Sequence, residues 1–132
     1  MSGRPLMKTV GAAAAGALID TAPLAQFLSS AQGYVQAYKA AYGSGPGPYS
    51  AYEYDAVGTI AAAIKKAGST DSKKITAALH NLGDYAGITG TFRFDSKGDR
   101  KPVSYIIITV KNGEFVADKK FDQSTSQWVS AS

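Results

Sequence analysis

The chain of 132 residues contains no cysteine, one histidine and one tryptophan. The lack of cysteine excludes disulfides and thiolate metal sites, but it does not indicate a cellular compartment, because a protein of any compartment can lack cysteine. The single histidine, His80, falls off the apolar face of its predicted helix, and no Ser or Thr stands with it and an acid in a recognisable motif. We therefore expect His80 to be solvent-exposed and the protein not to be an enzyme, with a hydrolase as a distant alternative.

Long apolar runs and blocks of like charge are also missing. No apolar run reaches the roughly 20 residues of a membrane-spanning helix. The residues after Met7 loosely resemble an export signal, but Asp20 ends the apolar stretch early, so we do not predict a signal peptide. The formal net charge is +4, and the lysines and arginines are spread along the chain. This spacing favours solvated faces over a nucleic-acid-binding stripe, and we expect no nucleic-acid partner.

No motif indicates a cofactor or a metal. The glycines of Gly43–Gly45 and Gly87–Gly90 are too few and too closely spaced for a phosphate-binding loop, so we predict no cofactor. The sequence DSKGD, residues 95–99, places carboxylates beside a glycine, as calcium loops do. It offers too few oxygens, and Lys97 adds a competing positive charge, so we predict a hairpin turn there.

The composition suits one domain of modest stability. Fourteen glycines and many alanines leave few bulky residues for the core. Residues 1–10 show no useful periodicity and are predicted to be a flexible N-terminal arm. Residues 122–132 are polar and are predicted to be a flexible tail, with Trp128 as its one possible anchor. The folded domain is therefore expected over residues 11–121.

The first half of the chain predicts a strand and then a helix. Residues 16–21, GALIDT, fit a short buried strand that leaves at Pro23. Residues 26–42 place tyrosines and small apolar residues at helical spacing, which predicts an amphipathic helix ended by Gly43. We expect its tyrosine stripe to pack rather than to carry chemistry. The sequence GSGPGP, residues 43–48, then makes a stiff connector.

The run from Pro48 to Gly68 is the most informative segment of the chain. Ser50 stands three residues before Glu53, the arrangement of a capping box at a helix start. Gly68 is placed to end this helix. Five apolar residues share one predicted face. They are Tyr54, Val57, Ile60, Ala61 and Ile64.

The second half predicts one more helix and then strands. Thr70 or Asp71 can cap a helix that Gly83 ends. Alternation after Gly90 suggests a strand, and the Asn112–Gly113 pair between two apolar runs is a strong hairpin signal. The fold class is therefore α/β, with about three helices followed by a C-terminal β-meander.

Five sequence motifs, in order, resemble one family. They are GAAAAGALIDTAP, YVQAYKAAYG, YSAYEYDAVGTIAAAIKKAGSTD, GITGTFRFDSKGDRK and SYIIITVKNGEFV, from about Gly11 to Val116. This order resembles the C-terminal portion of periplasmic branched-chain amino-acid-binding proteins, the leucine, isoleucine and valine receptors of ABC importers. The resemblance implies a partial type I periplasmic-binding-protein fold, a periplasmic location and an ABC permease as partner, with residues 11–121 as the C-terminal portion of the domain.

The resemblance also implies a ligand site. Tyr49 matches the aromatic residue that contacts the ligand side chain in the family, and Ser50 and Tyr52 are adjacent candidates. An aromatic face suits aliphatic groups, although Tyr49 could equally seal the helix entry. The family closes two lobes around an amino acid, and the resemblance leaves out the first lobe. We therefore expect an incomplete cleft, weak or absent ligand binding by this chain, and self-association through exposed lobe surface. The alternative function is a small basic protein- or nucleic-acid-interaction module.

Overall fold

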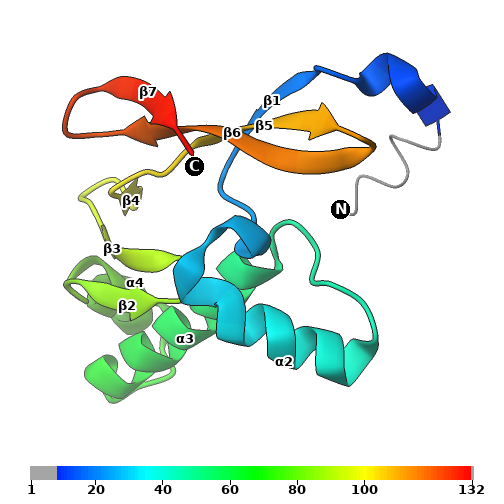
Figure 1. Ribbon diagram of the computed structural model, residues 1–132. Helices are drawn as coiled ribbons and strands as arrows, with labels where there is room; N and C mark the ends of the chain where they lie inside the picture. The colour runs from blue at the N-terminus through cyan, green and yellow to red at the C-terminus, as the bar shows by residue number, and fades with distance from the viewer. Residues whose placement is uncertain (1–8, 132) are drawn as a thin grey trace.

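A computed structural model describes residues 9–131 of the chain, as two antiparallel sheets and three α-helices (Figure 1). The helices are α2 (Gln32–Tyr42), α3 (Ser50–Ala67) and α4 (Ser72–His80). The larger sheet runs β1 (Leu18–Thr21), β5 (Ile106–Lys111), β6 (Glu114–Asp122), β7 (Gln127–Ser130) in that order. The smaller sheet runs β2 (Tyr85–Gly87), β3 (Gly90–Phe94), β4 (Arg100–Lys101). Except for Thr9 and Val10, the predicted N-terminal arm lies outside the described residues.

The C-terminal meander is confirmed. Strands β5, β6 and β7 follow one another as antiparallel neighbours. Asn112 and Gly113 join β5 to β6 with φ angles of 53° and 77°, and two positive φ values are what a tight two-residue hairpin requires. The tail, predicted to be loose, instead carries β7, and the Trp128 ring packs edge-on against Phe121 at 5.5 Å. A partner strand therefore orders a segment whose composition alone predicts disorder.

Strand β1 forms where it was expected but is not buried. It pairs only with β5 and so lies at one edge of the larger sheet. Its residues alternate between exposed and half-buried, and Leu18 is 67% exposed. The prediction of a buried strand is wrong for this reason.

Helix ends follow their local signals in most places. Gly43 and Gly68 end α2 and α3 in the left-handed conformation, with φ of 68° and 58°. Asp71 caps α4 by accepting a hydrogen bond from the Lys74 N–H at 3.1 Å. Helix α4 ends at His80, before the predicted stop at Gly83, with the Asn81 side-chain amide donating to the Ala77 carbonyl at 2.9 Å.

Helix α2 begins later than expected. The sequence predicts a helix from residue 26. In the structure the first residues of this segment form two short 3-10 turns instead, Ala25–Phe27 and Ser29–Ala31. The Gln32 side-chain amide donates to the carbonyls of Gln26 and Leu28, at 3.2 and 2.9 Å, and so links the two turns to the start of the helix.

The buried face of α3 is not the one that the sequence predicted. Small and polar residues face the interior, and the large apolar residues face outward. The buried residues are Ala51, Asp55, Thr59 and Ala63. On the opposite face Tyr54 is 58% exposed, Val57 70% and Ile60 47%. The sequence prediction followed the large apolar residues, whereas the buried face consists of two alanines and of Asp55 and Thr59, and Asp55 is buried because the β2–β3 turn donates hydrogen bonds to it.

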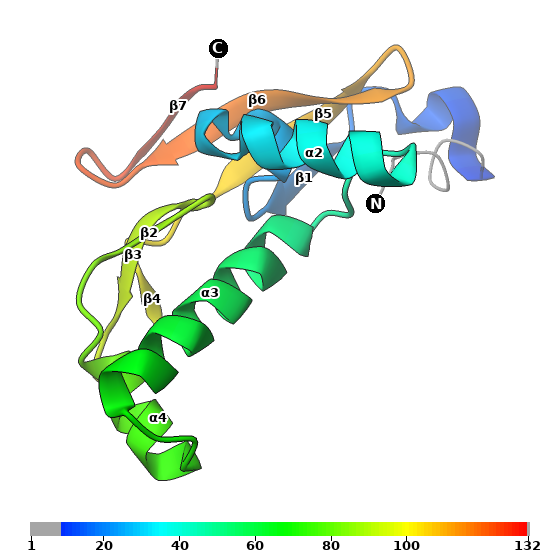
Figure 2. The same cartoon turned by 90° about the horizontal axis from the view of Figure 1, so that it is seen from below.

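The core is thin and divided. One cluster joins Ala25, Ala31, Val35 and Ala51 between the 3-10 turns, α2 and α3. The other lies against the larger sheet, with Leu24, Ile106 and Ile108 at its centre. Figure 2 shows α3 running from α2 to α4 along the smaller sheet. None of the helices in the described part is long and apolar enough to cross a membrane.

Candidate functional site

The three residues predicted to contact a ligand lie at the start of α3. Tyr49 is the last residue before the helix and is 61% exposed. Ser50 is half-buried, and its hydroxyl donates to the Gly47 carbonyl at 2.7 Å. Tyr52 is half-buried, and its hydroxyl donates to the Pro23 carbonyl at 2.9 Å. Burial raises the pKa of the Tyr52 hydroxyl above its ordinary value. Only Tyr49 therefore presents most of its side chain to solvent.

The predicted capping box does not form. Tyr49, not Ser50, occupies the position before the first helical residue, and no side chain caps the helix there. Because Ser50 is already helical, its hydroxyl turns back to Gly47 instead of reaching the Glu53 N–H, which bonds to the Tyr49 carbonyl at 3.0 Å. The reciprocal pairing of Ser50 with Glu53 is therefore wrong.

The sequence did not predict a buried hydrogen-bond network that lies beside Tyr52. Asp55 is 2% exposed and accepts hydrogen bonds from the Ile88 N–H at 2.8 Å and the Thr89 N–H at 2.9 Å. It also accepts one from the Thr89 hydroxyl. Arg100 donates to the same hydroxyl at 2.8 Å and to the Thr89 carbonyl at 2.9 Å. One hydroxyl thus bridges a buried acid and a base and ties α3 to the turn between β2 and β3 and to β4.

Two aromatic rings cover the Arg100 guanidinium. Its central carbon lies 4.0 Å from the centroid of the Phe92 ring and 5.5 Å from that of Tyr52, within range of cation–π attraction. Burial lowers the pKa of Arg100, and the nearby Tyr52 and Asp55 oppose that shift. The Arg100 guanidinium is therefore partly desolvated and packs against two aromatic rings.

A cavity of about 180 Å³ opens next to this arginine. It lies where the segments after β1 and before β5 run between the two sheets. Its lining residues are Ala22, Tyr52, Arg100, Val103, Ser104 and Tyr105. Of the three predicted ligand contacts, only Tyr52 lines it.

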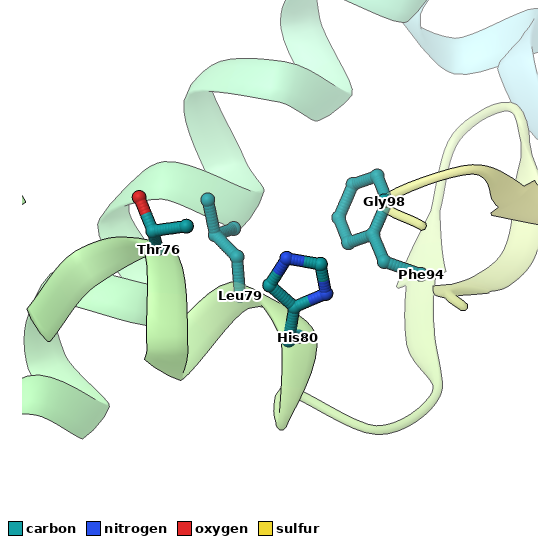
Figure 3. A pocket seen from close by; sticks show the side chains of 5 residues that line it. All are labelled: Thr76, Leu79, His80, Phe94 and Gly98. Atoms are coloured by element: carbon teal, nitrogen blue, oxygen red, sulfur yellow. The ribbon is translucent and has the colours of Figure 1, made fainter. Parts of the chain in front are cut away.

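The single histidine lies at a different surface. A cavity of about 140 Å³ is lined by Thr76, Leu79, His80, Phe94 and Gly98, and Figure 3 shows the imidazole between α4 and Phe94. The His80 side chain is exposed, as predicted, and its Nδ1 lies 3.2 Å from the Asp95 carbonyl oxygen. The residues that line this cavity include one hydroxyl, that of Thr76, but no acid, so they do not form an acid–histidine–hydroxyl triad.

The turn predicted at residues 95–99 is confirmed. One carboxylate oxygen of Asp95 accepts hydrogen bonds from the N–H groups of Lys97 and Asp99, both at 2.9 Å. The Asp99 N–H, and after it that of Lys97, hold the pKa of the Asp95 carboxyl below its ordinary value of 3.8. Within the described residues no group of three or more His, Cys, Asp or Glu could hold a metal ion.

The family follows from sequence and structure together. The sequence model of the periplasmic binding protein family matches residues 1–114, most of the chain. The chain belongs to this family. A leucine-binding protein, LivK from Thermotoga maritima, superposes on 92% of the chain with a TM-score of 0.80 and 29% identity. The resemblance and the fold class inferred from the sequence, a partial type I periplasmic-binding-protein fold, are therefore confirmed.

Other members of the periplasmic binding protein family match in the same way. An ABC-transporter substrate-binding protein from Desulfitobacterium hafniense, solved in complex with Leu, superposes on 84% of the chain with a TM-score of 0.63 and 28% identity. The Leu/Ile/Val-binding protein homolog 1 of Brucella abortus is 34% identical over 77 residues, 58% of this chain and 20% of its own length. The chain spans only 35% of the Thermotoga protein and 37% of the Desulfitobacterium protein.

Proposed function

We propose that this chain is part of the solute-binding component of an ABC importer and that its ligand is a branched-chain or related hydrophobic amino acid. The observation that carries the proposal is the superposition on LivK over nearly the whole chain. The Desulfitobacterium protein, which is similar over most of the chain, was solved with Leu. Its proposed place of action is the periplasm, its proposed partner is the ABC permease, and its role is binding rather than catalysis.

We assign Tyr49 to the ligand wall, meaning the part of the binding cleft that contacts the side chain of the ligand. Its ring is largely exposed at the start of α3, where the chain enters the helix from the connector. An exposed aromatic face can cover an aliphatic side chain at little cost in rotamer entropy. The Ser50 and Tyr52 hydroxyls are already engaged by the Gly47 and Pro23 carbonyls, so any contact of theirs with a ligand is expected to be secondary.

The isolated chain is expected to show no tight binding of leucine, isoleucine or valine in calorimetry. Closure of a two-walled cleft excludes water and strengthens polar contacts, and this chain spans about a third of the related structures. Micromolar or tighter binding by the isolated chain would contradict the incomplete cleft.

A chimera tests the wall itself. Replacing the matching part of the Thermotoga LivK by residues 11–121 is expected to give a folded protein that binds leucine. In this chimera Tyr49→Ala should weaken leucine binding about tenfold, because an aromatic contact of this kind contributes roughly 1–1.5 kcal/mol. Tyr42→Ala is the matched control, since Tyr42 is another tyrosine, 70% exposed, on α2. Equal affinities of the two variants would remove Tyr49 from the ligand wall.

The exposed face of α3 supports self-association of the chain as it stands. Tyr54, Val57 and Ile60 leave a continuous apolar row along the helix, and the Tyr54 ring lies 5.3 Å from that of Tyr34 on α2. In the described part of the chain no element covers this row, since each of its three residues is at least 47% exposed. We assign this face to a second copy of the chain.

Light scattering at high concentration is therefore expected to report a dimer. Val57→Lys should shift the population to monomer, because it places a charge in the middle of the apolar row. Gln36→Lys, at an exposed position of α2 on the side of that helix away from Tyr34, should leave the dimer intact. A strictly monomeric profile of the unmodified chain, or equal profiles of both variants, would contradict this assignment.

A further inference from the structure

We infer that the cavity beside Arg100 binds a small carboxylate with an apolar body. The cavity does not include Tyr49, although it shares Tyr52 with the predicted ligand contacts, and the inference does not rest on the proposed function. The cavity combines a partly desolvated cation with space for one small hydrocarbon group, and these are the two features that such a ligand requires.

The charge of Arg100 has no carboxylate in direct contact. In the described part of the chain, the ion pairs within 4.0 Å join Arg93 to Asp84 and Lys101 to Asp95. The carboxylate nearest in the network, Asp55, accepts its hydrogen bonds from Ile88 and Thr89. Because a buried charge is stabilised by a direct partner, an anion in the adjacent cavity would gain from Arg100 more than from an exposed lysine.

The donors needed for a carboxylate remain. A guanidinium carries five N–H groups, and the described contacts of Arg100 use two of them, both on Thr89. Those two contacts, together with the Phe92 ring, fix the side chain in place at the cavity wall. A fixed guanidinium loses little freedom when it binds a carboxylate.

The rest of the lining selects the body of the ligand. Ala22 and Val103 and the ring of Tyr52 are apolar surfaces, while Ser104 and Tyr105 add hydroxyls. The volume of about 180 Å³ compares with the roughly 150 Å³ apolar cavity that accommodates benzene. A branched aliphatic chain or a single aromatic ring therefore fits.

An α-ammonium group is disfavoured in this cavity. The lining contains Arg100 and no acid, so the ammonium of an amino acid would lie near a like charge with nothing to pair with. Isocaproate, which is leucine without its ammonium group, should therefore bind here better than leucine. This preference separates the Arg100 cavity from the proposed amino-acid wall.

The test is a titration of the isotope-labelled chain with isocaproate, followed by NMR. We expect saturable shifts at Ala22, Val103 and Tyr105, at least about tenfold weaker binding of leucine, and equally weak binding of isohexyl alcohol, which keeps the hydrocarbon and lacks the charge. Arg100→Met should weaken isocaproate binding at least about tenfold, and the matched control Arg93→Met, at an exposed arginine on β3, should leave it unchanged.

Arg100→Met also removes the two hydrogen bonds from Arg100 to Thr89, so a loss of binding could come from a local change of the fold. A second variant distinguishes this cause from the loss of the charge. Ala22→Leu keeps the arginine and fills the cavity, and it should abolish the shifts while the rest of the spectrum stays folded. Absence of saturable shifts, equal binding of the alcohol, or unchanged binding by Ala22→Leu would each overturn the inference. The leucine proposal would stand regardless, since it is measured in the chimera through Tyr49.

Discussion

Asp55→Ala is expected to lower the free energy of unfolding by about 3–5 kcal/mol, the larger of two severe losses that the structure predicts. The substitution leaves the N–H groups of Ile88 and Thr89 and the Thr89 hydroxyl without an acceptor in a buried setting. It also removes the negative charge that faces Arg100 through Thr89. A loss of this size is a large fraction of the stability of an ordinary domain.

Urea unfolding followed by circular dichroism measures the effect. Asp55→Asn should cost less, because its amide keeps one carbonyl acceptor for the turn. Asp84→Ala is the control, since Asp84 forms an exposed ion pair with Arg93 and should change stability by less than about 1 kcal/mol. A loss at Asp55 as small as that at Asp84 would show that the network does not hold the turn to α3.

Local signals in the sequence predicted the parts of the fold that depend on a few neighbouring residues. The Asn112–Gly113 hairpin, the Asp71 cap and the Gly43 helix end each depend on contacts within one turn. The register of β1 against β5 and the late strand β7 depend on partners far along the chain or on a neighbouring strand. Those features were missed or only half predicted, because composition does not reveal pairing.

The burial of α3 illustrates the same limit at the candidate site. Asp55 stands among apolar residues and looks like a solvent-facing interruption of the helix pattern. Its partners lie 33 and 34 residues further along the chain, on a turn whose strand β2 the sequence analysis did not identify. A carboxylate in line with Ala51, Thr59 and Ala63, four residues apart, is the signal that could have marked the buried face.

The position of Gly87 depends on the same carboxylate, and Gly87→Ala is expected to cost about 3 kcal/mol. A Cβ atom at this residue would lie 2.3 to 2.7 Å from the three carboxyl atoms of Asp55. Those atoms cannot swing away, because they are fixed by the Ile88 and Thr89 N–H groups that follow directly after Gly87. The turn must therefore move, and its hydrogen bonds to Asp55 lengthen.

Gly33→Ala is the matched control for this substitution. Gly33 lies in α2, and a Cβ atom added there would meet nothing within 4 Å, so alanine should stabilise the chain by about 0.5–1 kcal/mol through helix propensity. The same chemical change is thus expected to have opposite signs at two glycines. Equal effects at both would show that the close approach of Gly87 to Asp55 does not constrain the fold.

A double-mutant cycle separates crowding from a general weakness of the turn. In the Asp55→Ala background the carboxylate is gone, and Gly87→Ala should then cost less than about 1 kcal/mol, because the three atoms that crowd the added methyl group most closely are removed. The expected coupling between the two sites is therefore about 2 kcal/mol, which urea unfolding of the four proteins resolves. If the two losses simply add, the added methyl group does not clash with Asp55. The contact of Ile88 with the cluster of Ala25, Ala31, Val35 and Ala51 would then be what holds the β2–β3 turn against α3.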